Sequence, residues 1–266
     1  LVGLGDVYKR QPSIDLIYHD LKEIEDLHVE EIVKDEDWHF KKEIEVKRVT
    51  YAYPEGEGNV IENACFHIRK GETVAFVGSS GAGKSTIVDI LLGLLPPQQG
   101  KILVDGMDVY KNLRTWQKEI GYIPQTIYLS DDSIRNNVAF GIEEENIDEQ
   151  AVIAALKQAQ LYDFVDTLPE GLDTCVGDRG IRLSGGQRQR IGIARALYHK
   201  PEILVLDEAT SALDNDTEAA VMEAIDSLKG QKTIIIIAHR LTTIKNADTV
   251  YEVKDGKVEQ TTGVNT

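Results

Sequence analysis

The chain has 266 residues, of which 28% are charged, and its formal net charge is −16. It is long enough for one large domain or one domain with subdomains, while its acidity argues against a role in binding nucleic acid. The two cysteines, Cys65 and Cys175, form neither a disulfide framework nor a CxxC metal pair, which fits a reducing compartment. The most apolar run, Ile87–Leu95, contains Asp89 and is too short to span a bilayer.

The N-terminal part divides into two segments of different character. Residues 1–11, LVGLGDVYKRQ, open on leucine and resemble adapter read-through, so we expect this segment to be artefactual and exclude it from the fold. From Ile14 to Leu27 apolar residues recur every three or four positions, which predicts a helix with a charged opposite face. We expect residues 12–41 to form a linker helix that arrives from a missing upstream domain; a plain surface helix is the alternative.

The remainder, residues 42–266, is predicted to be one α/β domain. Its first part alternates apolar and polar residues between turn signals, which predicts an antiparallel β region. A short apolar strand then enters a glycine-rich loop, and the helix behind this loop is predicted over residues 84–95, ended by Pro96. Asp-Gly pairs at 105–106 and 255–256 predict two hairpins.

The second half of the domain is predicted to be mainly helical over about residues 133–200, and we place a helical subdomain at about 126–200. It then alternates strand, helix and strand in the runs EILVLDE, TEAAVMEAIDSL and KTIIIIAH. Strands that alternate with helices along a chain usually form a sheet that is mostly parallel. The fold class is therefore α/β, with a mostly parallel core.

The glycine-rich loop GSSGAGKST fits the P-loop pattern GxxxxGK[ST] and lies between a strand and a helix, as its mechanism requires. Its glycines let the backbone wrap phosphate groups with N–H groups pointing inward, and the helix N-terminus adds positive potential. Lys84 is expected to reach the β- and γ-phosphates, and Ser85 to hold Mg²⁺. The residues expected to bind the nucleotide here are Gly78, Ser79, Ser80, Gly81, Ala82, Gly83, Lys84, Ser85 and Thr86.

A second motif, ILVLDEAT, is a buried strand that ends in two acids. Asp207, at the carboxyl end of the strand, suits a contact to Mg²⁺. Glu208 points the other way along the pleat and is free to orient or deprotonate an attacking water. Such a pair is often only a loop cap, but a P-loop in the same chain favours the catalytic interpretation.

A third motif, LSGGQ, together with the other two, resembles the nucleotide-binding domain of ABC transporters over about residues 43–260. The resemblance implies a RecA-like P-loop NTPase core that binds ATP and Mg²⁺ and hydrolyses ATP. It also implies that two domains pair head to tail, with each ATP held by the P-loop of one and the signature of the other. The signature residues expected to contact the partner's ATP are Leu183, Ser184, Gly185, Gly186 and Gln187.

The same resemblance implies roles for four further residues. Gln125 in GYIPQ matches the Q-loop glutamine, which senses Mg²⁺ and the attacking water, and Asp214 in SALD matches the D-loop. His239 in IIAHR matches the switch histidine that contacts the γ-phosphate. Tyr53 in YAYP matches the aromatic that stacks on adenine, and Tyr51 is a weaker candidate.

Several segments indicate the branch of the family. TCVGDRG at 174–180 and DDSIRNNVAFG at 131–141 resemble exporters. The stretches PSIDLIYHDL and GYIPQTIYLSDDSIRNNVAFG resemble bacterial flippases of lipid-linked oligosaccharides. We therefore expect the C-terminal part of a half-transporter at the cytoplasmic face of the bacterial inner membrane. Its expected partners are a second ABC ATPase domain, as a homodimer, and a transmembrane domain fused upstream, with no nucleic acid.

Three other classes of protein remain as alternatives. An ABC ATPase of DNA repair would carry a coiled coil between Lys84 and Leu183, where no heptad run is found. A translation factor of the ABC type would carry two cassettes and a basic surface for RNA, whereas this chain has one cassette and is acidic. A binding module with inactive sites would lack Glu208 and His239.

Overall fold

The computed structural model describes Tyr18, Lys22 and residues 38–54, 56, 58–207, 214–238, 244 and 246–261. The chain forms two compact units, Leu1–Asp37 and Trp38–Thr266. In the first unit only Tyr18 and Lys22 are described, and both are helical. The segment 1–11 and nearly all of the expected linker helix therefore lie outside the described residues. Among the described residues, no helix has the length and apolar character needed to cross a bilayer.

A six-stranded sheet in the order β10-β9-β3-β8-β7-β6 forms the centre of the second unit. All neighbouring strands in it are parallel except β9 and β10, which form a hairpin. A sheet covered on both faces needs continuous apolar strands, and all five residues of β8 are buried. The strands are β3 Thr73–Val77, β6 Ile120–Ile123, β7 Ile203–Asp207, β8 Thr233–Ile237, β9 Thr249–Lys254 and β10 Lys257–Thr261.

A second, four-stranded sheet in the order β2-β1-β4-β5 is antiparallel throughout. Its β4–β5 turn and the β9–β10 turn are the two expected Asp-Gly hairpins. Both residues of each turn have positive φ, 51° and 85° at Asp105 and Gly106 and 48° and 75° at Asp255 and Gly256, as a type I′ turn requires. The strands are β1 Glu43–Tyr51, β2 Ile61–Arg69, β4 Gln99–Val104 and β5 Met107–Asp108.

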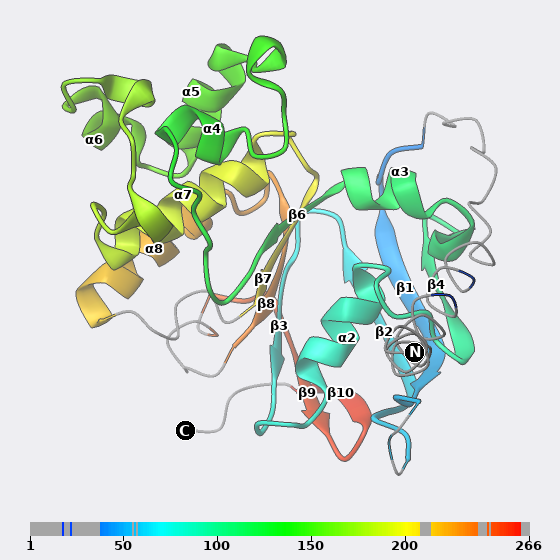
Figure 1. Cartoon of the computed structure of the whole chain (residues 1–266). Helices are drawn as coiled ribbons and strands as arrows, with labels where there is room; N and C mark the ends of the chain where they lie inside the picture. Colours follow the sequence, from blue (N-terminus) through cyan, green and yellow to red (C-terminus); the bar gives the residue numbers. More distant parts are fainter. Residues whose placement is uncertain are drawn as a thin grey trace, which may run out of the picture. The chain divides into compact units, whose positions relative to one another are not determined.

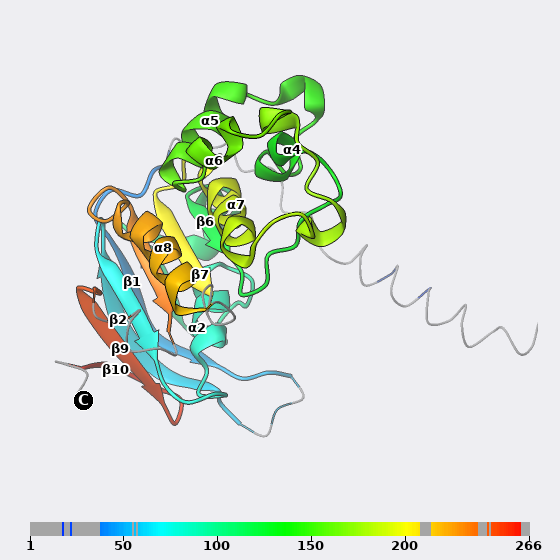
Figure 2. The same ribbon diagram turned by 90° about the vertical axis from the view of Figure 1, so that its left-hand side faces the viewer.

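Helices cover both faces of the parallel sheet. Figure 1 shows α2 between β3 and the antiparallel sheet, and the helices α4 to α8 on the other side. The same grouping is visible after the 90° turn of Figure 2. The described α-helices are α2 Lys84–Leu91, α3 Leu113–Lys118, α4 Ile134–Val138, α5 Glu149–Gln158, α6 Tyr162–Asp166, α7 Gly185–Leu197 and α8 Asn215–Asp226. The short 3₁₀ helices are η1 Val109–Lys111, η2 Glu144–Asn146, η3 Gly171–Asp173 and η4 Asp178–Gly180.

Two helices end earlier than expected. The helix after the P-loop ends at Leu91 rather than Leu95, because Gly93 adopts φ 76° and its N–H donates to the carbonyl of Ile90 at 3.1 Å. This is a Schellman cap, and it stops the helix before Pro96 is reached. The helical pattern after residue 150 is likewise split into α5 and α6 by Gln160, which adopts φ 52°.

The strands of the parallel sheet divide their side chains between two hydrophobic cores. One core contains α2 and the antiparallel sheet, and the other contains the helices from α4 to α8. Alternate residues of β7 and β8 enter the two cores: Ile203, Val205, Ile235 and Ile237 enter the first, and Leu204, Leu206, Ile234 and Ile236 the second. Each face of the sheet is therefore fixed by its own core, and the carboxyl ends of the strands are left at one edge, where α/β folds bind ligands.

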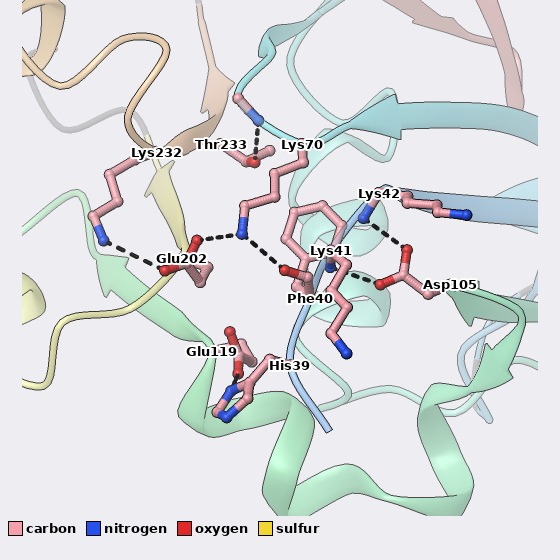
Figure 3. Close-up of polar contacts among 11 residues, drawn as sticks. His39, Phe40, Lys41, Lys42, Lys70, Asp105, Glu119, Glu202, Lys232 and Thr233 are labelled. Atoms are coloured by element: carbon pink, nitrogen blue, oxygen red, sulfur yellow. Dashed lines mark hydrogen bonds and ion pairs between the residues drawn. The ribbon is translucent and has the colours of Figure 1, made fainter. Parts of the chain in front are cut away.

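The segment just before β1 is held by polar contacts from distant parts of the fold (Figure 3). The Asp105 carboxylate accepts the backbone N–H groups of Lys41, Lys42 and Glu43 at 2.6, 2.9 and 3.0 Å. Lys70 Nζ donates to the carbonyl of Phe40 at 2.9 Å. We call residues 38–43 the anchor segment.

Two carboxylates extend these contacts to the parallel sheet. His39 Nδ1 lies 2.8 Å from Glu119 Oε1, and Lys70 Nζ also pairs with Glu202 Oε2 at 2.7 Å. The hydrogen bond from Lys70 holds the pKa of Glu202 below its ordinary value. Glu119 precedes β6 and Glu202 precedes β7, so the anchor segment is connected to the starting ends of two parallel strands.

Candidate nucleotide-binding site

The P-loop connects the end of β3 to the start of α2, and its glycines are needed for space as well as for backbone conformation. Gly78 has φ 151°, and a β-carbon built there would come within 3.0 Å of the Val253 carbonyl oxygen. Gly83 has φ 102°, a conformation that favours glycine, and a β-carbon there would come within 3.0 Å of the end of the Ile61 side chain. Side chains at these positions would therefore force the loop away from the sheet.

Lys84 occupies the centre of this loop. Its side chain is 4% exposed, and Nζ donates to the carbonyl oxygens of Gly78 and Ser79, each at 3.0 Å. The ammonium group and the N-terminus of α2 thus concentrate positive potential at the loop. Ser85, the next residue, is exposed, whereas Thr86 is buried. This arrangement suits an anion with several oxygens, such as a polyphosphate.

Two tyrosines lie beside the P-loop helix, and they differ in exposure. The Tyr53 hydroxyl lies 3.2 Å from Thr86 Oγ1, and its ring is 41% exposed. Tyr51 packs edge-on against Tyr53 with ring centroids 5.2 Å apart, but it is only 5% exposed. The ring of Tyr53 is therefore accessible to a flat ligand, whereas the ring of Tyr51 is not.

Two carboxylates, Asp89 on α2 and Asp207 at the carboxyl end of β7, lie close enough to influence each other. The Tyr122 hydroxyl, from β6, donates to Asp207 Oδ2 at 3.2 Å. Burial, followed by the charge of Asp207, raises the pKa of Asp89 on α2, and the same two causes raise the pKa of Tyr122 to about 12. Tyr122 therefore stays protonated near neutral pH, and the two carboxylates repel each other.

This donor set fits a magnesium ion. A divalent cation would relieve the repulsion between Asp89 and Asp207, and hard oxygen ligands are those that Mg²⁺ prefers. Among the described residues, no three His, Cys, Asp or Glu side chains form a cage for a metal.

The expected Q-loop residue lies at the same edge of the sheet. Gln125 is exposed and follows β6, whose last residue, Ile123, pairs with Leu206 of β7. Gln125 and Asp207 thus lie at the ends of two adjacent strands, and Lys84 follows β3 at the same edge of the sheet, with β8 between β3 and β7. Glu208 and His239 lie outside the described residues.

Sequence reasoning missed Tyr122 and Asp89 as parts of this site. A signal was present for each. Tyr122 is the exposed residue between two buried neighbours of β6, and Asp89 lies four positions after Ser85, on the same side of α2.

The LSGGQ motif forms the N-terminus of α7. Ser184 is the N-cap: its Oγ accepts the Gln187 N–H at 3.2 Å, and Gln187 Oε1 accepts the Ser184 N–H at 2.8 Å. This capping box leaves Ser184 exposed at a positive helix end. Leu183 packs in the core with α4 to α8, whereas α2 packs in the core on the opposite face of the sheet. The signature and the P-loop of one chain therefore belong to different faces.

Asp214 plays the corresponding part for α8. It is the N-cap of this helix, and its carboxylate accepts the Thr217 N–H at 3.0 Å and the Thr217 hydroxyl at 2.7 Å. The side chain is exposed. Asp214 and Ser184 thus stand at the N-termini of two helices that pack in the same core.

The parallel sheet, the P-loop and Asp207 at the end of β7 define a P-loop nucleotide-binding domain. A family model described as "ABC transporter" matches residues 61–211, more than half of the chain. The chain therefore belongs to the ABC transporter family, and it is an ATP-hydrolysing domain of that family. The α/β fold expected from the resemblance is confirmed.

Named relatives are similar over most of this chain. An ATP-dependent lipid A-core flippase of Pectobacterium atrosepticum is 43% identical over 219 residues, which are 82% of this chain and 38% of the relative. ABC transporter B family member 13 of Arabidopsis thaliana is 44% identical over 82% of this chain and 17% of its own length. A bacterial Atm1-family ABC exporter solved with ATP bound superposes with a TM-score of 0.78 at 36% identity, covering 97% of this chain and 45% of that one. The chain thus spans less than half the length of these proteins.

Proposed function

We propose that this domain drives export, or flipping between membrane leaflets, of a lipid or another amphipathic substrate through ATP-dependent closure of a dimer. The supporting observation is that the P-loop and LSGGQ pack in cores on opposite faces of one sheet. One chain then presents two half-sites that face different ways, and two chains in head-to-tail arrangement would complete both. The second domain in this proposal is an identical chain.

In the proposed cycle the P-loop amides and Lys84 bind the phosphates of ATP, and Tyr53 stacks on the adenine. Ser85, Gln125 and Asp207 would hold a Mg²⁺ ion, which supplies neutralisation of the β- and γ-phosphate oxygens. Glu208 orients the attacking water for in-line attack.

Two contacts to the γ-phosphate complete the proposed site. His239 contacts the γ-phosphate as negative charge spreads over its oxygens. The positive end of α7 from the second chain covers the same phosphate through Ser184 and the amides of Gly185 and Gly186. Binding of ATP closes the dimer, and hydrolysis with phosphate release reopens it.

A transmembrane domain, fused upstream in the parent protein, is the second proposed partner. The two exporter-like segments lie side by side: Ser133 pairs with Cys175 in an isolated β-bridge, and the Ile134 N–H donates to the Thr174 carbonyl at 3.0 Å. Phe140, at the end of the first segment, is 55% exposed. We propose this surface as the contact to the membrane domain, at the cytoplasmic face of the bacterial inner membrane.

The dimer proposal is tested by the ATPase rate per chain as a function of protein concentration. The rate should rise with concentration, and Ser184→Arg should lower it more than about tenfold while ATP binding to the P-loop persists. Gln158→Arg, an exposed change of equal charge on α5, serves as control and should hydrolyse ATP normally. A constant rate per chain for a demonstrated monomer, or normal hydrolysis by Ser184→Arg, would refute the shared site.

A further inference from the structure

The N-terminal turns of helices α7 and α8 come into close contact at Gly186. A β-carbon built on Gly186 would come within 3.0 Å of Cγ2 of Thr217 and 3.7 Å from its Cβ. Gly186 is not among the residues with positive φ, so the backbone there would accept any residue. Gly186 therefore lacks a side chain because Thr217 of the same chain occupies the position where its β-carbon would lie.

Thr217 cannot easily turn its methyl group away. Its hydroxyl donates to Asp214 Oδ2 at 2.7 Å, and its N–H donates to Asp214 Oδ1 at 3.0 Å. A β-branched side chain has few χ1 positions, and the hydrogen bond to Asp214 selects one of them. The methyl that faces Gly186 and the hydroxyl that holds Asp214 are thus fixed together.

We propose that Thr217 is a positioning residue that keeps Asp214 and the signature helix at a fixed spacing, and that Gly186 lacks a side chain to admit it. The N-termini of α7 and α8 would then approach a second nucleotide-binding domain as one rigid unit. The effect on hydrolysis rests on the proposed dimer, whereas the contact itself lies within one chain. The competing explanation is that Gly186 is a glycine only because the partner's nucleotide comes close.

Two isosteric changes at Thr217 separate these explanations in the full chain. Thr217→Ser removes the methyl and keeps the hydroxyl, while Thr217→Val keeps the shape and removes the hydroxyl. Each is combined with Gly186→Ala in a double-mutant cycle. The measurements are the thermal unfolding midpoint without nucleotide and kcat and KM for ATP.

Gly186→Ala is expected to lower the unfolding midpoint by about 2–6 °C and kcat by about tenfold. KM should change little, because the P-loop is untouched. Adding Thr217→Ser should bring the unfolding midpoint to within about 1–2 °C of that of the single variant Thr217→Ser. It should also bring kcat to within about threefold of the value for that variant. Adding Thr217→Val should not rescue either quantity.

The proposal is overturned if Gly186→Ala with Thr217→Ser is as unstable and slow as Gly186→Ala alone. Recovery of the midpoint without recovery of kcat would also overturn it, because the β-carbon would then act on the partner's nucleotide. Loss of concentration-dependent hydrolysis in the unmodified chain would count against the proposed dimer alone. The unfolding midpoints would still decide whether Gly186 and Thr217 share this space.

Discussion

Replacing Asp105 with alanine removes the carboxylate that accepts three backbone N–H groups of the anchor segment. Loss of a side-chain cap on backbone amides costs about 0.5–2 kcal/mol in folded proteins. Hydrogen bonds to charged groups lie at the upper end of the usual range, but two of these three are exposed. We therefore expect a loss of about 2 kcal/mol, or about 4–8 °C in the unfolding midpoint of a domain of this size.

The matched control is Asp255→Ala. Asp255 occupies the same position of the second type I′ hairpin, with φ 48° against 51° for Asp105. Both variants lose the same turn preference, so the difference between their unfolding midpoints isolates the three hydrogen bonds. Urea unfolding followed by circular dichroism gives an independent value. A difference below about 1 °C would refute the conclusion that Asp105 holds the anchor segment.

Three further results are expected. Glu208→Gln should keep ATP binding but abolish turnover and trap the closed dimer on a sizing column, and substantial residual hydrolysis would remove Glu208 from its proposed role. Tyr122→Phe removes the hydrogen bond from Tyr122 to Asp207 and should weaken the Mg²⁺-dependent part of ATP binding by about threefold to tenfold, while binding in EDTA is unchanged; equal weakening in both conditions would contradict this. Because the pKa of Glu202 is lowered from 4.5, its ion pair with Lys70 is fully effective above that pH. The difference in unfolding free energy between the wild type and Glu202→Gln should be below about 1 kcal/mol, because both groups are partly exposed. It should shrink as the pH falls and the Glu202 carboxyl of the folded protein is protonated. A difference that does not depend on pH would contradict this contribution of the ion pair.

Most of the fold could be predicted because its signals are local. The two Asp-Gly pairs and the apolar runs of β3, β7 and β8 each depend on a few neighbouring residues. The errors came from competing local signals. Gly93 ends α2 before Pro96 can, and Gln160 splits the predicted long helix by adopting a left-handed conformation that its residue type does not favour.

The site could be predicted only as far as its motifs reach. That Asp89 and Tyr122 gather around Asp207 depends on the pairing of β6 with β7 and on the face that α2 turns to them. The contact of Gly186 with Thr217 depends on the packing of α7 on α8. These are long-range relations, and periodicity along one segment carries no information about which residues of another segment it meets.

The anchor segment also determines how a mechanical load would enter this domain. Glu119 and Glu202 stand immediately before β6 and β7, and the other ends of these strands lead to Gln125 and Asp207. A tension applied to the chain at Trp38 would therefore enter β1, with which the anchor segment is continuous, and would also be shared with the starting ends of β6 and β7 through the contacts of His39 with Glu119 and of Lys70 with Phe40 and Glu202.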